Sequence, residues 1–172
     1  KRDSISNFKG NITAQLKGTS VDDAYGDIRF KNTTYVNQND TYNFKDFKIS
    51  STFNEEEERT LRVNSPDILN GIVKGKFKFK NLGNLFKNSF ASLYKNYEPE
   101  VYTDFEYVSF DLKIYNKIVG VFFPKVNFGK NTFIKGSVAS DESKFKFDFQ
   151  SPKININENS IDNIVFQIDN TN

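Results

Sequence analysis

Val73-Lys-Gly-Lys-Phe-Lys-Phe-Lys80 is the stretch of sequence that most directly indicates the fold. Every second residue is apolar or glycine, and every residue between them is a lysine. Successive side chains of a β-strand point to opposite faces, so this pattern predicts a strand with one apolar face and one charged face. The sheet that contains it should have one side for water and one side for something apolar.

The same two-residue period recurs along most of the chain. It is interrupted by polar turns, and the run Glu55–Glu58 predicts a hairpin with an acidic tip. The connections are short, so we predict an all-β fold, a curved and mostly antiparallel sheet of roughly ten to twelve strands. The residues expected on its apolar face are Ile28, Phe30, Phe47, Ile49, Phe53, Leu61, Val63, Val73, Phe77, Phe79, Phe110, Leu112, Ile114, Val121, Phe123, Phe145, Phe147 and Phe149.

One segment, residues 81–97, departs from the strand rhythm. Its apolar residues follow the spacing of a helix, and Pro99 prevents the helix from continuing. We expect a short amphipathic helix here, inserted between two blocks of strands. It packs as a lid on one end of the sheet, or alternatively touches a lipid or a partner.

Composition excludes several classes of function. The net charge is +2, from 24 basic and 22 acidic residues of mixed order, so no basic footprint for nucleic acid is expected. The chain has no His and no Cys, which removes Ser-His-Asp and Cys-His catalysis and the usual zinc ligands. The nine glycines form no phosphate-binding loop. We therefore predict a protein that is not an enzyme and uses no metal and no cofactor.

Carboxylate chemistry is the remaining catalytic alternative. The residues Glu55–Glu58 are consecutive, so alternate members point apart, and a hydrated turn explains them better than a paired acid and base. A carboxylate hydrolase is accordingly the least favoured hypothesis.

The chain also lacks features of a complete membrane protein. No run approaches the ~18 apolar residues needed to span a bilayer. The sequence opens with Lys1-Arg2-Asp3 and contains no Met. We interpret residues 1–172 as a single β-repeat segment of a longer protein.

The apolar face itself has two interpretations, which predict the same alternation. In an open curved sheet it lines a groove of Phe, Ile, Val and Leu that suits acyl chains. In a closed β-sandwich it is covered by a second sheet, and the chain is a structural or adhesin-like spacer with no ligand.

Three strings resemble one family of proteins. They are Phe47-Lys-Ile-Ser-Ser-Thr-Phe53, Leu61-Arg-Val-Asn-Ser-Pro-Asp-Ile68 and Gly71-Ile-Val-Lys-Gly-Lys-Phe-Lys-Phe79. Together with Ile114-Tyr-Asn-Lys-Ile118 and Phe149-Gln-Ser-Pro-Lys-Ile154, they resemble the TamB or AsmA-like family of translocation and assembly module proteins, in the form associated with Bacteroidota. The resemblance extends over most of the chain and is carried by degenerate β-repeat motifs.

The resemblance implies a fold and a function. The fold is a U-shaped hydrophobic groove, or β-taco, lined by the apolar residues named above. The function is bridge-like transport, in which the groove accommodates phospholipid or other acyl chains between the inner and outer membranes. The parent would be periplasmic, anchored in the inner membrane by a segment outside these residues, and would meet an Omp85-class outer-membrane protein. The family implies no catalytic residue here.

Overall fold

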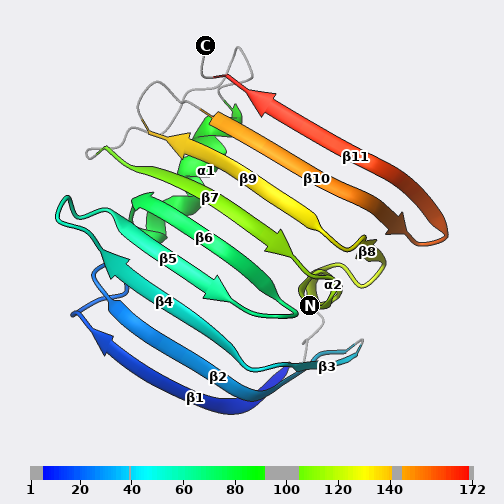
Figure 1. Ribbon diagram of the computed structural model, residues 1–172, viewed down its shortest axis with the longest axis horizontal. Coiled ribbons are helices and arrows are strands. Elements are labelled where there is room, and N and C mark those ends of the chain that lie inside the picture. The colour runs from blue at the N-terminus through cyan, green and yellow to red at the C-terminus, as the bar shows by residue number, and fades with distance from the viewer. Residues whose placement is uncertain (1–5, 39, 92–104, 141–144, 171–172) are drawn as a thin grey trace.

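The computed structural model describes residues 6–38, 40–91, 105–140 and 145–170, which form one open, curled sheet of eleven strands (Figure 1). The strands are β1 (Asn7–Lys17), β2 (Tyr25–Val36), β3 (Thr41–Phe44), β4 (Phe47–Phe53), β5 (Arg59–Asn64), β6 (Leu69–Lys76), β7 (Tyr107–Ile114), β8 (Val126–Phe128), β9 (Thr132–Ala139), β10 (Phe145–Ile156) and β11 (Asn159–Asp169). The helices are α1 (Leu82–Ala91), α2 (Asn116–Phe122) and a 3-10 turn, η1 (Phe79–Asn81).

The topology is close to a simple meander. The strand order is β1-β2-β4-β5-β6-β7-β9-β10-β11, with β3 beside β2 and β8 beside β10. Every described pair is antiparallel. The all-β, mostly antiparallel fold class is therefore confirmed. The described residues form one sheet and no second sheet covers it, so the sandwich architecture is not found.

The register aligns the apolar residues of neighbouring strands into rows on one face, because residues paired across antiparallel strands share a face. The Ile49 row consists of Ala14, Ile28, Ile49, Val63, Gly71, Leu112, Ile134, Phe149 and Phe166. The Phe147 row consists of Leu16, Gly26, Ser51, Leu61, Val73, Phe110, Gly136, Phe147 and Ile168. Both rows cross nine strands without a charged residue, and together they define what we call the apolar face.

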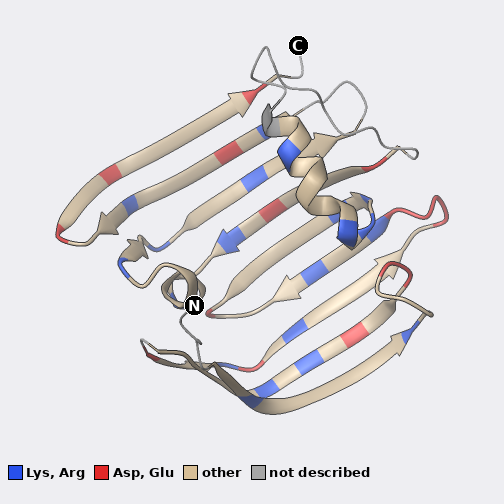
Figure 2. Cartoon of the chain, turned by 180° about the vertical axis from the view of Figure 1, so that it is seen from behind, with Lys and Arg blue, Asp and Glu red and all other residues tan. Residues whose placement is uncertain are grey.

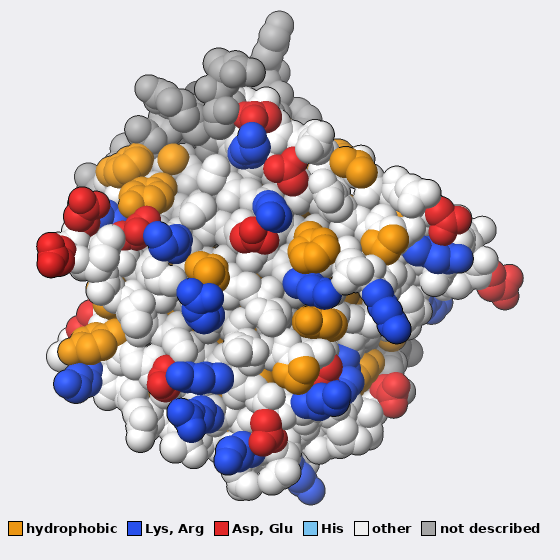
Figure 3. Space-filling model, viewed as in Figure 1, with side chains coloured by type: hydrophobic (Ala, Val, Ile, Leu, Met, Phe, Trp, Pro, Cys, Tyr) orange, Lys and Arg blue, Asp and Glu red, His pale blue; other side chains and the backbone are white. Residues whose placement is uncertain are grey.

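The opposite face is charged and hydrated. Figure 3 looks onto this side, where acidic and basic side chains alternate and hydrophobic ones are scattered. Several of the charges pair across strands: Lys48 Nζ lies 2.8 Å from the Asp27 carboxylate, and Lys135 Nζ lies 2.8 Å from that of Asp111. Solvent screens such exposed pairs, so they contribute little to stability. Their main effect is to keep this face in water.

The sheet curls around the apolar face. The Tyr42 side chain lies on the apolar side of β3, and its hydroxyl donates to the carbonyl of Gly120 in α2, 2.8 Å away. The helix α2 follows β7 in the chain, and β7 lies four strands away from β2 in the sheet, after β4, β5 and β6. The hydrogen bond therefore joins distant parts of the sheet. Lys117 Nζ adds a bond to the Asn43 carbonyl at 2.7 Å and an ion pair with Asp67. These contacts tie α2 across the inner side of the curl.

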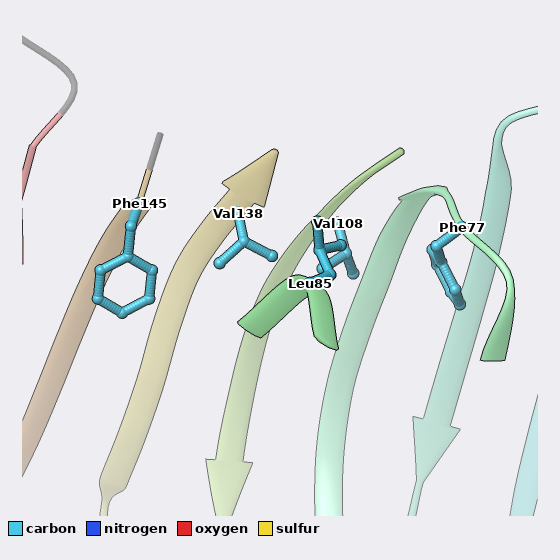
Figure 4. Close-up of a cluster of buried hydrophobic side chains, with 5 residues drawn as sticks. All are labelled: Phe77, Leu85, Val108, Val138 and Phe145. Atoms are coloured by element: carbon cyan, nitrogen blue, oxygen red, sulfur yellow. The ribbon is translucent and has the colours of Figure 1, made fainter. Parts of the chain in front are cut away.

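A small core lies at one end of the apolar face, beneath α1. It consists of Phe77, Leu85, Val108, Val138 and Phe145 (Figure 4). In the view from behind, α1 crosses in front of the strands on this side (Figure 2). The predicted helix is thus present from Leu82 to Ala91, packed on the sheet as the lid interpretation expected, and its predicted continuation to residue 97 lies outside the described residues.

The structure corrects two predicted strand segments. Phe77 and Phe79 do not belong to a strand, because β6 ends at Lys76 and the chain turns off the sheet into η1 and α1. Val121 and Phe123 were expected on a strand, but Val121 lies in α2 and Phe123 follows it, 63% exposed. The contacts of α2 with β3 and with Asp67 hold this segment helical, and tertiary contacts of this kind override a local β preference.

Candidate functional site

The apolar face is the candidate site, and all of the predicted site residues that lie in strands are found on it. They are Ile28, Phe30, Phe47, Ile49, Phe53, Leu61, Val63, Val73, Phe110, Leu112, Ile114, Phe145, Phe147 and Phe149. Phe77 and Phe79 lie beside the same face at the α1 end, whereas Val121 and Phe123 are on or next to α2.

The middle of the apolar face is incompletely covered. No apolar side chain of the Ile49 row or the Phe147 row is buried, and at the sheet edges Leu16 is 45% exposed and Phe166 is 49% exposed. A soluble domain normally covers an apolar surface of this extent, because leaving it in water costs roughly 25 cal/mol per Å2. The face is therefore available to an apolar ligand or partner.

Aromatic rings and glycines give the face its relief. Phe30 stacks on Phe47 with ring centroids 4.3 Å apart, while Phe147 lies 6.5 Å from Phe110 and 6.1 Å from Phe166. Gly136 lies between Phe110 and Phe147 in their row, and a Cβ there would come within 2.6 Å of the Phe110 ring. The Phe110 ring thus lies over a position where the sheet has no side chain.

The α1 end of the face is closed by a buried arginine. Arg59 is 2% exposed, and its guanidinium carbon lies 4.7 Å from the Phe53 ring centroid and 4.9 Å from that of Phe79. It donates to the carbonyls of Val21, at 3.2 Å, and Asp22. Desolvation lowers the pKa of this guanidinium, an effect opposed by the nearby acidic residues of the loop. The β1–β2 loop is thereby held over the apolar face.

The β1–β2 loop is itself pre-formed. The Asp23 carboxylate accepts the backbone N–H groups of Thr19 and Ser20 and both of their hydroxyl groups. These bonds, the Thr19 N–H first, hold the pKa of the Asp23 carboxyl well below its usual range. The Asp22 carboxylate accepts the Phe79 N–H at 2.7 Å, which joins the loop to η1.

Sequence reasoning missed the two buried charges of this end, Arg59 and Glu106. Arg59 is two residues from Leu61, and Glu106 is two residues from Val108, so each occupies an apolar phase of the alternation. A charged residue at a position where the period requires an apolar one was the signal that could have found them.

The acidic tip proves to be a turn. The Asn54 side-chain oxygen accepts the N–H groups of Glu56 and Glu58, at 3.1 and 2.8 Å, and Glu57 takes a positive φ of 61°. Glu58 also pairs with Lys74. Across the described residues, no group of three or more acidic, His or Cys side chains could hold a metal ion.

Comparisons with known proteins add no family. A scan against protein-family models found no match. Searches of curated proteins and of solved structures found none either. Of the helices in the described part of the chain, none is long and apolar enough to cross a membrane.

Proposed function

We propose that the apolar face binds the acyl chains of lipids, and that this chain is a segment of a bridge-like lipid carrier of the TamB type. The observation that supports the proposal is the pair of rows that cross nine strands without a charge and whose apolar side chains are not buried. In this proposal the chain conducts or holds lipid and catalyses no reaction.

The dimensions of the face suit extended hydrocarbon. Neighbouring strands are about 4.8 Å apart, so a row of nine strands extends for about 38 Å. The two rows are separated by two residues along each strand, or about 7 Å. The backbone N–H and C=O groups between them are used in the sheet, so the face offers dispersion contacts and almost no polar partner. Acyl chains meet these requirements, and polar substrates do not.

The cellular setting belongs to the same proposal. In the family that the sequence resembles, the parent is a periplasmic protein anchored in the inner membrane, and it meets an Omp85-class protein at the outer membrane. We extend both expectations to the parent of this chain. Cross-linking in the intact cell envelope, followed by identification of the attached protein, tests the partner directly.

A structural spacer is the second candidate, and one observation favours it. β1 and β11 form the two edges of the sheet, each eleven residues long, and each has one side unpaired by any described strand. A spacer could extend by strand addition at these edges without binding any ligand. The two candidates differ in whether the isolated protein retains or takes up lipid.

The experiment compares charges placed on the two faces of one strand. Ile49→Asp puts a carboxylate in the middle of the apolar face, and Thr52→Asp puts one on the exposed opposite face of β4. We expect a fluorescent fatty acid to bind the unsubstituted chain and Thr52→Asp equally. It should bind Ile49→Asp at least about tenfold more weakly, because an acyl chain cannot solvate a charge.

Circular dichroism confirms that each variant is folded before binding is compared, and native mass spectrometry of the unsubstituted chain reports bound lipid. Equal binding by all three proteins, or no binding by the unsubstituted chain, would show that this face does not carry lipid.

A further inference from the structure

Two buried charges at the α1 end each have an unsatisfied atom. Arg59 is 2% exposed and Glu106 is 3% exposed. Glu106 Oε1 accepts the Asn81 amide at 2.7 Å, but its Oε2 has no hydrogen-bond partner, and neither has Arg59 Nε. No ion pair with another described residue involves either charge. Leaving such atoms buried and unpaired is costly, so their arrangement calls for an explanation.

Both side chains line one cavity of about 550 Å3. Its lining includes Gly75 of β6, which is paired with Arg59 of β5 on one side and with Val108 of β7 on the other. Gly75 has a φ of 152°, and a Cβ there would lie 2.0 Å from the Tyr107 carbonyl oxygen. A glycine is therefore required at this position, and no side chain stands between Arg59 and Val108 in this row.

The lining of the cavity is aromatic with charges of both signs. The aromatic residues are Tyr25, Phe53, Phe77 and Phe105. The acidic residues are Asp22, Asp23, Glu57 and Glu106, and the basic ones are Arg59, Lys76 and Lys78. Four acidic against three basic groups attract neither a simple anion nor a simple cation strongly. A ligand group that carries both charges, attached to something apolar, complements such a lining.

We propose that this cavity receives the headgroup of a zwitterionic amphiphile, a phosphate beside a primary ammonium, whose acyl chains lie on the apolar face. The phosphate accepts a hydrogen bond from Arg59 Nε, and the ammonium donates one to Glu106 Oε2. Gly75 is two residues from Val73 of the Phe147 row, so the cavity adjoins the rows that would hold the chains. This inference rests on the proposed function, and it names the lipid class.

Access to the Arg59 guanidinium requires the Phe53 ring to move. Arg59 Nε and Glu106 Oε2 are both shielded from water, and the Phe53 ring that covers the guanidinium is itself 38% exposed. A headgroup that displaces this ring outward reaches Arg59, and in the bound state its phosphate and ammonium supply the missing partners of Arg59 Nε and Glu106 Oε2.

The test compares three short-chain phospholipids with identical acyl chains, measured by isothermal titration calorimetry on the whole protein. Phosphatidylethanolamine carries phosphate and a cation with N–H donors. Phosphatidylcholine carries phosphate and a quaternary ammonium without N–H. Phosphatidylglycerol carries phosphate and two hydroxyl groups but no cation. We expect phosphatidylethanolamine to bind at least about tenfold more tightly than either of the others. Equal binding of the three lipids, or tighter binding of phosphatidylglycerol, would overturn the headgroup site.

Glu106→Gln and Glu55→Gln are the matched variants. We expect Glu106→Gln to lose the preference for phosphatidylethanolamine over phosphatidylcholine, and Glu55→Gln, which is exposed on the acidic tip and does not line the cavity, to retain it. If Glu106→Gln keeps the full preference, Glu106 does not hold the ammonium and the inference is wrong.

The two proposals fail in different ways. Binding of fluorescent fatty acid and of all three lipids without discrimination removes the headgroup site and leaves the acyl-binding face. Absence of binding by every lipid removes both.

Discussion

Phe145→Ala should reveal where the stability of this open sheet resides. Phe145 is 0% exposed, packs in the core beneath α1 and stacks on Phe147 with centroids 6.1 Å apart. A buried aromatic side chain removes about 150–250 Å2 from water, which contributes about 4–6 kcal/mol at about 25 cal/mol per Å2. Alanine retains part of this burial, so we expect the free energy of unfolding to fall by about 3–5 kcal/mol.

The matched control is Phe166→Ala, which removes the same side chain from the same face at the β11 edge. Phe166 is 49% exposed and has Phe147 as a ring neighbour at 6.1 Å. We expect it to cost no more than about 1.5 kcal/mol.

Urea unfolding followed by circular dichroism measures the free energy of unfolding of both variants, and thermal unfolding gives their melting temperatures. The melting temperature of Phe145→Ala should fall by about 6–20 °C, on the scale of about 2–4 °C per kcal/mol for a chain of this size. Equal losses for the two variants would refute the reasoning, because they would mean that the middle and edge of the face contribute to folding as much as the α1 end does.

Three further outcomes are expected. Gly136→Ala should destabilise the protein by about 1–3 kcal/mol in urea unfolding, because its Cβ would lie 2.4 Å from the Lys146 carbonyl oxygen and 2.6 Å from the Phe110 ring; an unchanged midpoint would mean that the Phe110 ring does not lie over this position. Tyr42→Phe should cost about 0.5–1.5 kcal/mol by removing the hydrogen bond to Gly120, and hydrogen exchange should show faster opening of α2, whereas unchanged exchange would contradict the role of this bond. Asp23→Asn should lower stability at neutral pH, and the difference from the parent should shrink as the pH falls below the ordinary carboxylate range. The sign follows because the Asp23 pKa is depressed in the folded state, so its contribution is complete above the unfolded pKa and is lost as the pH falls through the folded one; a difference that persists at low pH would refute it.

The partial coverage of the apolar face connects fold and proposed function. α1 covers the row that contains Val108 and Val138, and α2 is tied to β3 at the opposite end. Between them the two nine-strand rows stay partly exposed. The chain therefore gains a core at one end of the sheet, while the rest of the face stays partly exposed.

The candidate site was largely predictable because its signal is local. Alternation in a strand such as β10 assigns Phe145, Phe147 and Phe149 to one face from their spacing alone, and the register then keeps them there. The buried charges were not predicted, since nothing near Arg59 in the chain shows that the β1–β2 loop will supply it with carbonyl oxygens.

By itself, the sequence determined the β class, the position of most strands, the membership of the apolar face and the helix that begins at Leu82. Each of these follows from periodicity within a few residues. The tertiary structure alone decided that Val121 lies in a helix, that β6 ends before Phe77, and that no second sheet among the described residues covers the face. Those outcomes depend on contacts between segments distant in the chain, such as Tyr42 with Gly120. Periodicity carries no information about which distant segment will pack against a given strand.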